Sequence, residues 1–153
     1  MENIAAKYFV YLKQQDEANG QSFSLSNLKL QKLLYFLQMY HYEKHGQLFF
    51  KDNVFEAWRY GPVIPKVYDE FKSFGANDIF LIQTPDLSIL SEQQRESIRN
   101  IWYFLRNKTA SQLVTASHKE GGPWHIVYND KKTPLKKIDN KLIEAEVDSL
   151  ERS

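Results

Sequence analysis

Apolar residues recur at helical spacing along most of the chain, and residues 27–45 are apolar on two opposite sides. On a helical wheel one broad face consists of Leu30, Leu33, Leu34, Leu37 and Tyr40, and a nearly opposite face of Leu28, Tyr35, Met39 and Tyr42. A helix that is apolar on two sides has to be covered on both. We therefore predict that residues 27–45 form the central helix, with Ser24 or Ser26 as N-cap and an end at His45-Gly46.

Five further helices are predicted around this one. A first helix over 3–18 has an apolar stripe and ends near Asn19-Gly20, and a short helix over 64–73 starts at Pro65. Two capping boxes, Ser91 with Gln94 and Thr109 with Gln112, predict the starts of two more helices, the second running over 110–118 and ending at Gly121-Gly122-Pro123. Asp139 is the expected N-cap of a last helix over 139–151, with either Leu142, Ala145 and Leu150 or Ile143, Val147 and Leu150 facing inward.

Extended structure is predicted only between residues 48 and 60. Leu48-Phe49-Phe50 and the run from Val54 to Tyr60 suggest two short strands around a polar turn at Lys51-Asp52-Asn53, followed by a break at Gly61-Pro62. Residues 76–90 are irregular, and 79–82 fit either a brief strand or a buried loop. The predicted fold class is mainly α: a compact helical domain around a central buried helix at about 27–45, with a short β-hairpin near 48–58.

Length and composition add bounds to this picture. The 153 residues correspond to one domain, 1–153, since no repeat or linker interrupts them, and the net charge of +1 gives no global attraction to nucleic acid or anionic membrane. The absence of cysteine excludes disulfides, cysteine nucleophiles and cysteine-ligated metals. With neither a secretion signal nor an apolar run long enough for a membrane span, we expect a cytoplasmic protein with no membrane partner.

Four histidines offer the candidate catalytic and metal-binding chemistry. His41 and His45 are four residues apart on the central helix and could reach one metal ion, but no third ligand is evident. His118 follows Ser117 directly, and adjacent side chains on a helix diverge, so a serine–histidine pair is not favoured. We expect no cofactor and no resident metal. A metal-dependent hydrolase using His41, His45 or His118 remains the competing class.

Lysines gather near the end of the chain, and they raise a second alternative, a DNA-binding regulator. The cluster is formed by Lys119, Lys131, Lys132, Lys136, Lys137 and Lys141. No helix-turn-helix spacing, zinc finger or RNA-binding aromatic motif accompanies it. A solvated loop therefore explains the cluster better, and we do not expect nucleic acid as a partner.

Aromatic residues favour protein binding over catalysis, since phosphate-binding and nucleophile motifs are absent and aromatic side chains dominate interface hot spots. The most individual segment runs from Trp58 to Pro65. In an extended chain, Trp58 and Tyr60 would project together and Arg59 to the opposite side, and Gly61-Pro62 would set the following turn. This segment is either a rigid aromatic shelf at the surface or a wall for the central helix.

Several blocks taken in order resemble a known family. They are the run from Leu28 to Phe36; Phe55-Glu56-Ala57-Trp58 leading into Tyr60-Gly61-Pro62-Val63-Ile64-Pro65 and Tyr68; and Ser117-His118 with Glu120, then Pro123-Trp124. Together, over about residues 3–128, they resemble the Panacea domain of SocA-like antitoxins, also described as phage-associated or GepA-type proteins. Ser117 stands where the family pattern has threonine, and two glycines precede Pro123.

The resemblance implies a mostly helical, non-enzymatic antitoxin of a type II-like toxin–antitoxin system, with a cognate toxin as its partner. Family members neutralise toxins by direct protein contact, and one instead delivers its toxin to a Clp protease. DNA-binding segments often precede the domain in relatives; this chain starts almost at the domain, so autoregulation by DNA binding is not expected. The predicted partner-binding residues are Trp58, Tyr60, Gly61, Pro62, His118, Glu120 and Trp124.

Overall fold

The computed structural model describes residues 1–132 and 136–151, and its secondary structure is mainly helical. In chain order its elements are α1 (Glu2–Ala18), α2 (Asn27–His45), β1 (Glu56–Trp58), β2 (Gly61–Val63), α3 (Pro65–Phe71), the 3-10 helix η1 (Lys72–Phe74), α4 (Glu92–Leu105), α5 (Ala110–Ser117), α6 (Pro123–Tyr128) and α7 (Asn140–Glu151). The predicted class, a helical fold with one short hairpin, is confirmed.

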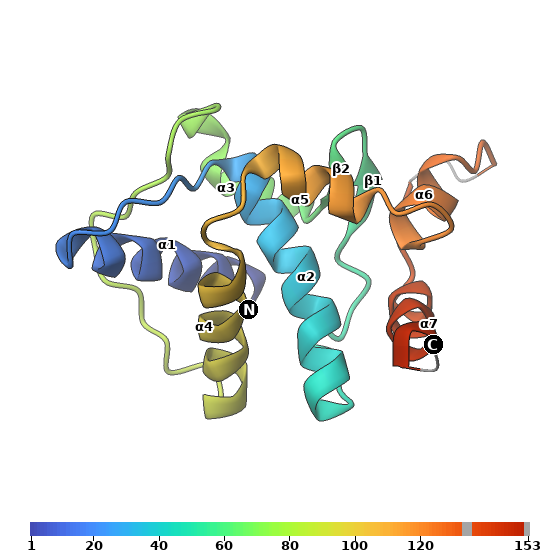
Figure 1. The fold of residues 1–153 in the computed structure, drawn as a ribbon, viewed down its shortest axis with the longest axis horizontal. Helices are drawn as coiled ribbons and strands as arrows, with labels where there is room; N and C mark the ends of the chain where they lie inside the picture. Colours follow the sequence, from blue (N-terminus) through green and yellow to red (C-terminus); the bar gives the residue numbers. More distant parts are fainter. Residues whose placement is uncertain (133–135, 152–153) are drawn as a thin grey trace.

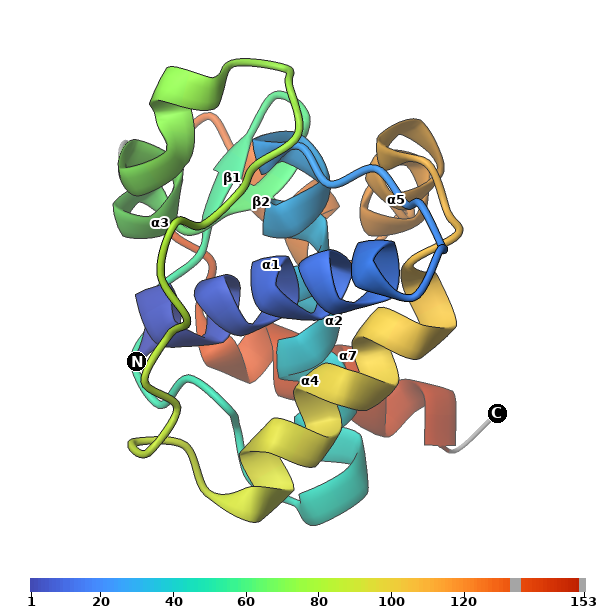
Figure 2. The same cartoon turned by 90° about the vertical axis from the view of Figure 1, so that its left-hand side faces the viewer.

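Helix α2 is the central helix that its two apolar faces predict. It contacts α1, α3, α4, α5, α7 and β2, and Figure 1 shows it descending through the middle of the molecule between α4 and α7. Figure 2 shows α1 crossing in front of it. Leu30, Leu33, Leu34 and Leu37 are fully buried. The helix begins at Asn27 with Ser26 as N-cap, and Gly46 ends it in the left-handed conformation that glycine adopts without strain.

Polar side chains on α2 are buried as well, and they hold loops against the helix. Gln38 exchanges two hydrogen bonds of 2.8 Å with the backbone of Phe50. Gln31 accepts one of 2.9 Å from the Ile64 amide. Lys29 donates to the carbonyl oxygen of Arg106, the residue that ends α4, at 2.6 Å. Because loop backbone cannot satisfy its own polar groups inside a protein, these contacts fix where the loops run.

The helix starts predicted from capping boxes are confirmed. Ser91 with Gln94 and Thr109 with Gln112 form complete boxes at the beginnings of α4 and α5. Asp139 accepts a hydrogen bond of 2.9 Å from the Lys141 amide at the start of α7, where Ile143 and Val147 face the core, as in the second of the two predicted sets. Leu150, predicted to face inward in either set, is 48% exposed instead.

The position predicted for the hairpin is wrong by several residues. Its strands are β1 and β2, antiparallel with Trp58 opposite Gly61, so the turn is at Arg59-Tyr60 and not at Lys51-Asp52-Asn53. The predicted break at Gly61-Pro62 is the start of β2. Ala57, opposite Pro62, donates its amide hydrogen away from β2, to the carbonyl oxygen of Lys136. Ala57 and Pro62 therefore face each other without a ladder hydrogen bond between them, and a proline without an amide hydrogen is tolerated at such a position.

One more local expectation is incomplete. Gly121-Gly122-Pro123 does not merely end a helix: Gly122 is the N-cap and Pro123 the first residue of α6, a short helix that the sequence pattern did not predict. Of the two alternatives for residues 79–82, a brief strand or a buried loop, the structure has a loop in which Ile79 is buried and donates its amide hydrogen to the carbonyl oxygen of Leu25. Residues 133–135, which lie between the lysines of the predicted cluster, are outside the described residues.

Candidate functional site

The hairpin, α5 and α6 bring most of the predicted partner-binding residues together above α2. Trp58 ends β1, Gly61 and Pro62 begin β2, His118 ends α5, and Trp124 lies in the first turn of α6. Trp124 donates its indole hydrogen to the carbonyl oxygen of Trp58 at 2.7 Å. This bond ties α6 to the hairpin, and because it uses the backbone of Trp58 it leaves that indole ring free of the tie.

A column of three aromatic rings supports this bond. The imidazole of His118 stacks on the indole of Trp124 with 3.6 Å between ring centres and an interplanar angle of 6°. Tyr128 also stacks on Trp124, with 4.6 Å between ring centres. Only 6% of Trp124 is exposed. Trp124 is therefore chiefly a structural member of the site, which holds the hairpin in place, and His118 covers one face of its ring.

Lys32 lies fully buried beneath the hairpin. Its Nζ donates to the carbonyl oxygen of Pro62 at 2.8 Å. Burial lowers the pKa of Lys32 to about 7, because the charged form loses its hydration and no carboxylate compensates. The amine thus anchors the hairpin mainly as a hydrogen-bond donor. The sequence offered one signal for it, a lysine in the middle of a helix predicted to be covered on both sides.

Gly61 permits this close approach. A Cβ at this position would lie 2.5 Å from Cε of Lys32 and 2.7 Å from Oγ of Ser117, and its φ of +109° is rarely open to any other residue. Gly61 therefore has a packing role that the predicted turn did not capture. A side chain here would have to displace the Lys32 and Ser117 side chains or shift the hairpin.

His118 is not arranged as a catalytic base for Ser117. The hydroxyl of Ser117 donates to the carbonyl oxygen of Val114 at 2.8 Å, so its proton points into α5 and not toward the imidazole. Burial and the nearby charge of Lys32 lower the pKa of His118. Its Nε2 is buried without a hydrogen-bond partner among the described residues. The ring accordingly packs as a neutral group.

The outer side of the hairpin forms an aromatic surface, which we call the hairpin shelf: Trp58, Arg59, Tyr60 and Tyr68. Trp58 and Tyr68 meet edge to face at 5.0 Å, and the guanidinium of Arg59 lies 5.4 Å from the ring centre of Tyr60. Tyr60 is 56% exposed. All four residues line a groove of about 320 Å³. The prediction that the Arg59 side chain projects to the side opposite Trp58 and Tyr60 is wrong, because residues 59 and 60 form the turn and not a strand.

Glu120 is apart from the other predicted residues. It lies in the loop after α5, is exposed, and has no hydrogen bond or ion pair within the part of the chain that the structure describes. The structure therefore divides the predicted set. Trp58 and Tyr60 face outward, Gly61, Pro62, His118 and Trp124 hold them from behind, and Glu120 takes no part in that support.

The two histidines of α2 are packed rather than poised for a metal. Nδ1 of His41 lies 2.7 Å from the Ser97 hydroxyl, and the two imidazoles are 4.6 Å apart. Burial, together with the charges of His45 and Lys51, lowers the pKa of His41 to about 4. Among residues 1–132 and 136–151 no three histidine, aspartate or glutamate side chains are placed to hold a metal ion.

The lysine cluster is partly used for internal contacts. Nζ of Lys136 donates to the carbonyl oxygens of Tyr128 and Asp130, at 3.1 and 2.7 Å, which satisfies the end of α6. Lys119 pairs with Glu146 at 3.1 Å. Two lysines of the cluster, Lys119 and Lys136, are therefore engaged in contacts within the chain. No helix of the described chain is both long enough and apolar enough to cross a membrane.

Comparison with known proteins places this chain in a family. The Antitoxin SocA-like, Panacea domain family matches residues 30–125, which contain most of α2, the hairpin, α5 and the tryptophan of α6. The chain belongs to this family. Antitoxin SocA of Caulobacter vibrioides (strain NA1000 / CB15N) is 35% identical over 136 residues, covering 78% of this chain and 69% of the relative. No solved structure matches the chain significantly.

Proposed function

We propose that this protein is an antitoxin that neutralises a cognate toxin by direct protein–protein binding, without catalysing a reaction. Membership of the SocA-like family carries the proposal, together with the identity of 35% to a protein named as an antitoxin. The proposal takes residues 1–153 as one folded unit, since buried residues from α1 to α7 belong to one hydrophobic cluster. It also takes the cytoplasm as the place where the protein acts.

The hairpin shelf is the toxin-binding surface in this proposal. Tyrosine, tryptophan and arginine are the side chains most enriched at interface hot spots, and the shelf presents all three types. Its backbone is held from behind by Lys32 and Trp124, so little conformational entropy is lost when a partner binds. A rigid aromatic surface of this kind suits recognition of another folded protein.

Binding and growth rescue test the proposal. The toxin is the growth-inhibiting protein encoded beside this gene, and its affinity for the purified antitoxin is measured by calorimetry. Trp58→Ala and Tyr60→Ala are expected to weaken binding by at least about tenfold, as loss of a hot-spot residue does, and to reduce rescue. Trp58→Ala keeps the carbonyl oxygen that accepts from Trp124, so the fold should persist. Ile82→Ala, at a side chain 94% exposed in another loop, is the matched control.

Two outcomes would contradict this proposal. Unchanged affinity in both shelf variants would remove the hairpin shelf from the interface, and stoichiometric zinc or manganese in the purified protein would favour the competing hydrolase class. The toxin level during rescue separates two modes of action. A constant level indicates direct inhibition, whereas a level that falls only in cells with a Clp protease indicates delivery for degradation.

A further inference from the structure

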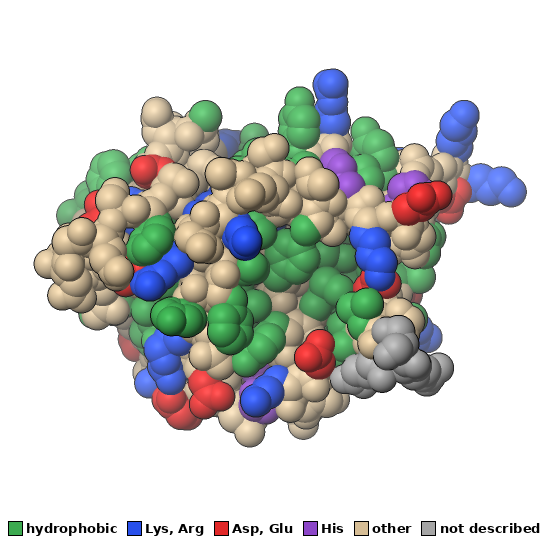
Figure 3. Space-filling model, viewed as in Figure 1, with side chains coloured by type: hydrophobic (Ala, Val, Ile, Leu, Met, Phe, Trp, Pro, Cys, Tyr) green, Lys and Arg blue, Asp and Glu red, His purple; other side chains and the backbone are tan. Residues whose placement is uncertain are grey.

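A second surface, distinct from the hairpin shelf, is an apolar groove between α2, α4, α5 and α7. Figure 3 shows hydrophobic side chains gathered in the middle of the face on which these helices lie. The groove has a volume of about 550 Å³, and its lining is mainly apolar, with Phe36, Met39 and Tyr40 from α2, Phe104 from α4, Leu113 from α5 and Val147 from α7. A groove lined by large apolar side chains on the surface of a folded chain is a candidate interaction site.

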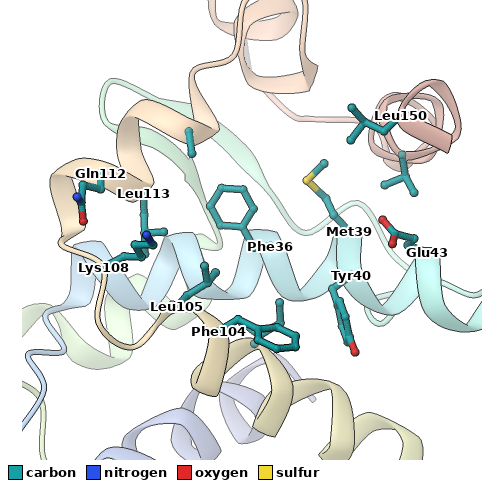
Figure 4. A pocket seen from close by; sticks show the side chains of 13 residues that line it. Phe36, Met39, Tyr40, Glu43, Phe104, Leu105, Lys108, Gln112, Leu113 and Leu150 are labelled. Atoms are coloured by element: carbon teal, nitrogen blue, oxygen red, sulfur yellow. The ribbon is translucent and has the colours of Figure 1, made fainter. Parts of the chain in front are cut away.

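Opposite charges lie at the two ends of this groove. Figure 4 shows Lys108 beside Gln112 at one end and Glu43 at the other, with Phe36 and Met39 between them. Both charged side chains are exposed, and within the described residues neither forms an ion pair. Apolar side chains of α2 form the floor of the groove between these two ends. The segment of α2 from Phe36 to Glu43 is roughly 10 Å long at 1.5 Å per residue.

Large apolar side chains also project at the edge of the groove. Phe104, in the last turn of α4, is 54% exposed, and its neighbour Tyr103 is 66% exposed. Phe104 is held in place by edge-to-face contacts with Tyr40 and Tyr103, at 6.2 and 6.1 Å. The same surface therefore offers both a hollow and a side chain that could fill such a hollow in another molecule.

We propose that this groove is the interface of a symmetric homodimer, in which a second copy of this chain occupies it. A two-fold contact sets each patch against itself with its direction reversed. Lys108 of one copy then faces Glu43 of the second, and the reverse pair forms at the other end. Phe104 of each copy packs into the hollow of the other. The positions of Lys108 and Glu43 are therefore complementary to those in a second copy of the same chain.

The apolar groups and the charged pairs contribute differently to this interface because they lie in different parts of it. Burial of the apolar floor and of Phe104 provides the affinity. The two Lys108–Glu43 pairs at the rim are exposed, so they add little affinity but set the register and orientation of the copies. The proposal does not depend on the antitoxin function.

Sedimentation of the purified full-length chain over a wide concentration range tests the dimer. We expect a species of twice the 18.1 kDa of one chain that dissociates on dilution. Phe104→Glu should raise the dimer dissociation constant by at least about tenfold, since it places a charge in the apolar hollow of the other copy. Ile82→Glu, at an apolar side chain that is 94% exposed in the loop before α4, should leave it unchanged. Circular dichroism verifies that both variants fold.

Charge reversal supplies a test that a nonspecific contact would fail. Glu43→Lys alone sets lysine against Lys108 twice, and Lys108→Glu alone sets glutamate against Glu43 twice, so each variant should dimerise about fivefold or more weakly. Mixing the two variants restores opposite charges at both ends, and a heterodimer should form. A monomer at every concentration, a dimer insensitive to Phe104→Glu, or a mixture that associates no better than the separate variants would each overturn the proposal.

Discussion

Replacing Lys32 by methionine tests whether burial of this amine beneath the hairpin destabilises the folded protein when the amine is charged. Lys32 is fully buried, donates to the Pro62 carbonyl oxygen at 2.8 Å, and has a pKa lowered from 10.5 to about 7 by burial. Methionine keeps an unbranched apolar chain that can fill the same space but removes the ionisable group. Lys32→Met therefore separates the cost of burying a charge from the benefit of the hydrogen bond.

The pH dependence follows from the direction of this pKa shift. Because the folded-state pKa lies below that of the unfolded chain, the unfolded chain binds more protons between about pH 7 and pH 10.5, and stability rises with pH across this window. A shift of about 3.5 units at 1.36 kcal/mol each corresponds to about 4–5 kcal/mol, which is missing below the window and regained above it.

The variant is free of this cost but leaves the Pro62 carbonyl without its donor, a loss of about 1–3 kcal/mol. Lys32→Met should therefore be more stable than the parent at neutral pH, by about 1–3 kcal/mol. The advantage should shrink as pH rises and vanish or reverse near pH 9.5. This change of sign distinguishes a buried, weakly basic amine from an ordinary packing contact.

Urea unfolding of both proteins at a series of pH values measures this difference. Comparison of the two cancels the titration of Lys29, whose pKa is also lowered, to about 8, chiefly by burial. The reasoning is refuted if Lys32→Met is less stable than the parent at neutral pH, or if the difference between the two does not change with pH. Either result would mean that the Lys32 amine is protonated in the folded protein and that its contacts there make up for its lost hydration.

Three further stability predictions follow from the packing. Gly61→Ala should cost about 2–5 kcal/mol in chemical unfolding, from backbone strain at positive φ and from overlap with Lys32; a loss below about 0.5 kcal/mol would contradict the close approach. Leu33→Ala should cost roughly 2–5 kcal/mol, and Leu37→Ala likewise, because both are fully buried on the central helix; near-neutral values would make that helix peripheral. Since the pKa of His41 is lowered to about 4, its contribution to stability is present above about pH 6.5 and lost as pH falls toward 4, so the melting temperature of His41→Gln should fall less on acidification than that of the parent.

Local signals were sufficient wherever a few neighbouring residues decide the structure. The boxes Ser91 with Gln94 and Thr109 with Gln112 place two helix starts, because each closes its hydrogen bonds within four residues. The bounds of α2 followed from its apolar faces and its caps. The hairpin was misplaced because Phe49 and Phe50, which read as a strand, are instead buried in a loop that hydrogen-bonds to Gln38.

The candidate site could be named from the sequence only in part. Trp58, Gly61 and His118 stood out in the sequence and, with Trp124, belong to the blocks of the family resemblance, but their roles were not predicted. Which aromatic ring faces outward and which supports it depends on where α6 meets the hairpin, and the bond from Trp124 to the Trp58 carbonyl joins residues 66 positions apart. Local periodicity carries no information about such a contact.

The amino-acid sequence alone determined the helical class, the central position of residues 27–45, the family and most helix ends. These depend on side-chain spacing and on capping groups close together in the chain. The tertiary structure alone decided the strand pairing, the burial of Lys32 beneath Gly61 and the groove with Lys108 and Glu43 at its ends. Each of these depends on segments far apart in the chain, whose meeting is set by the packing of the whole core.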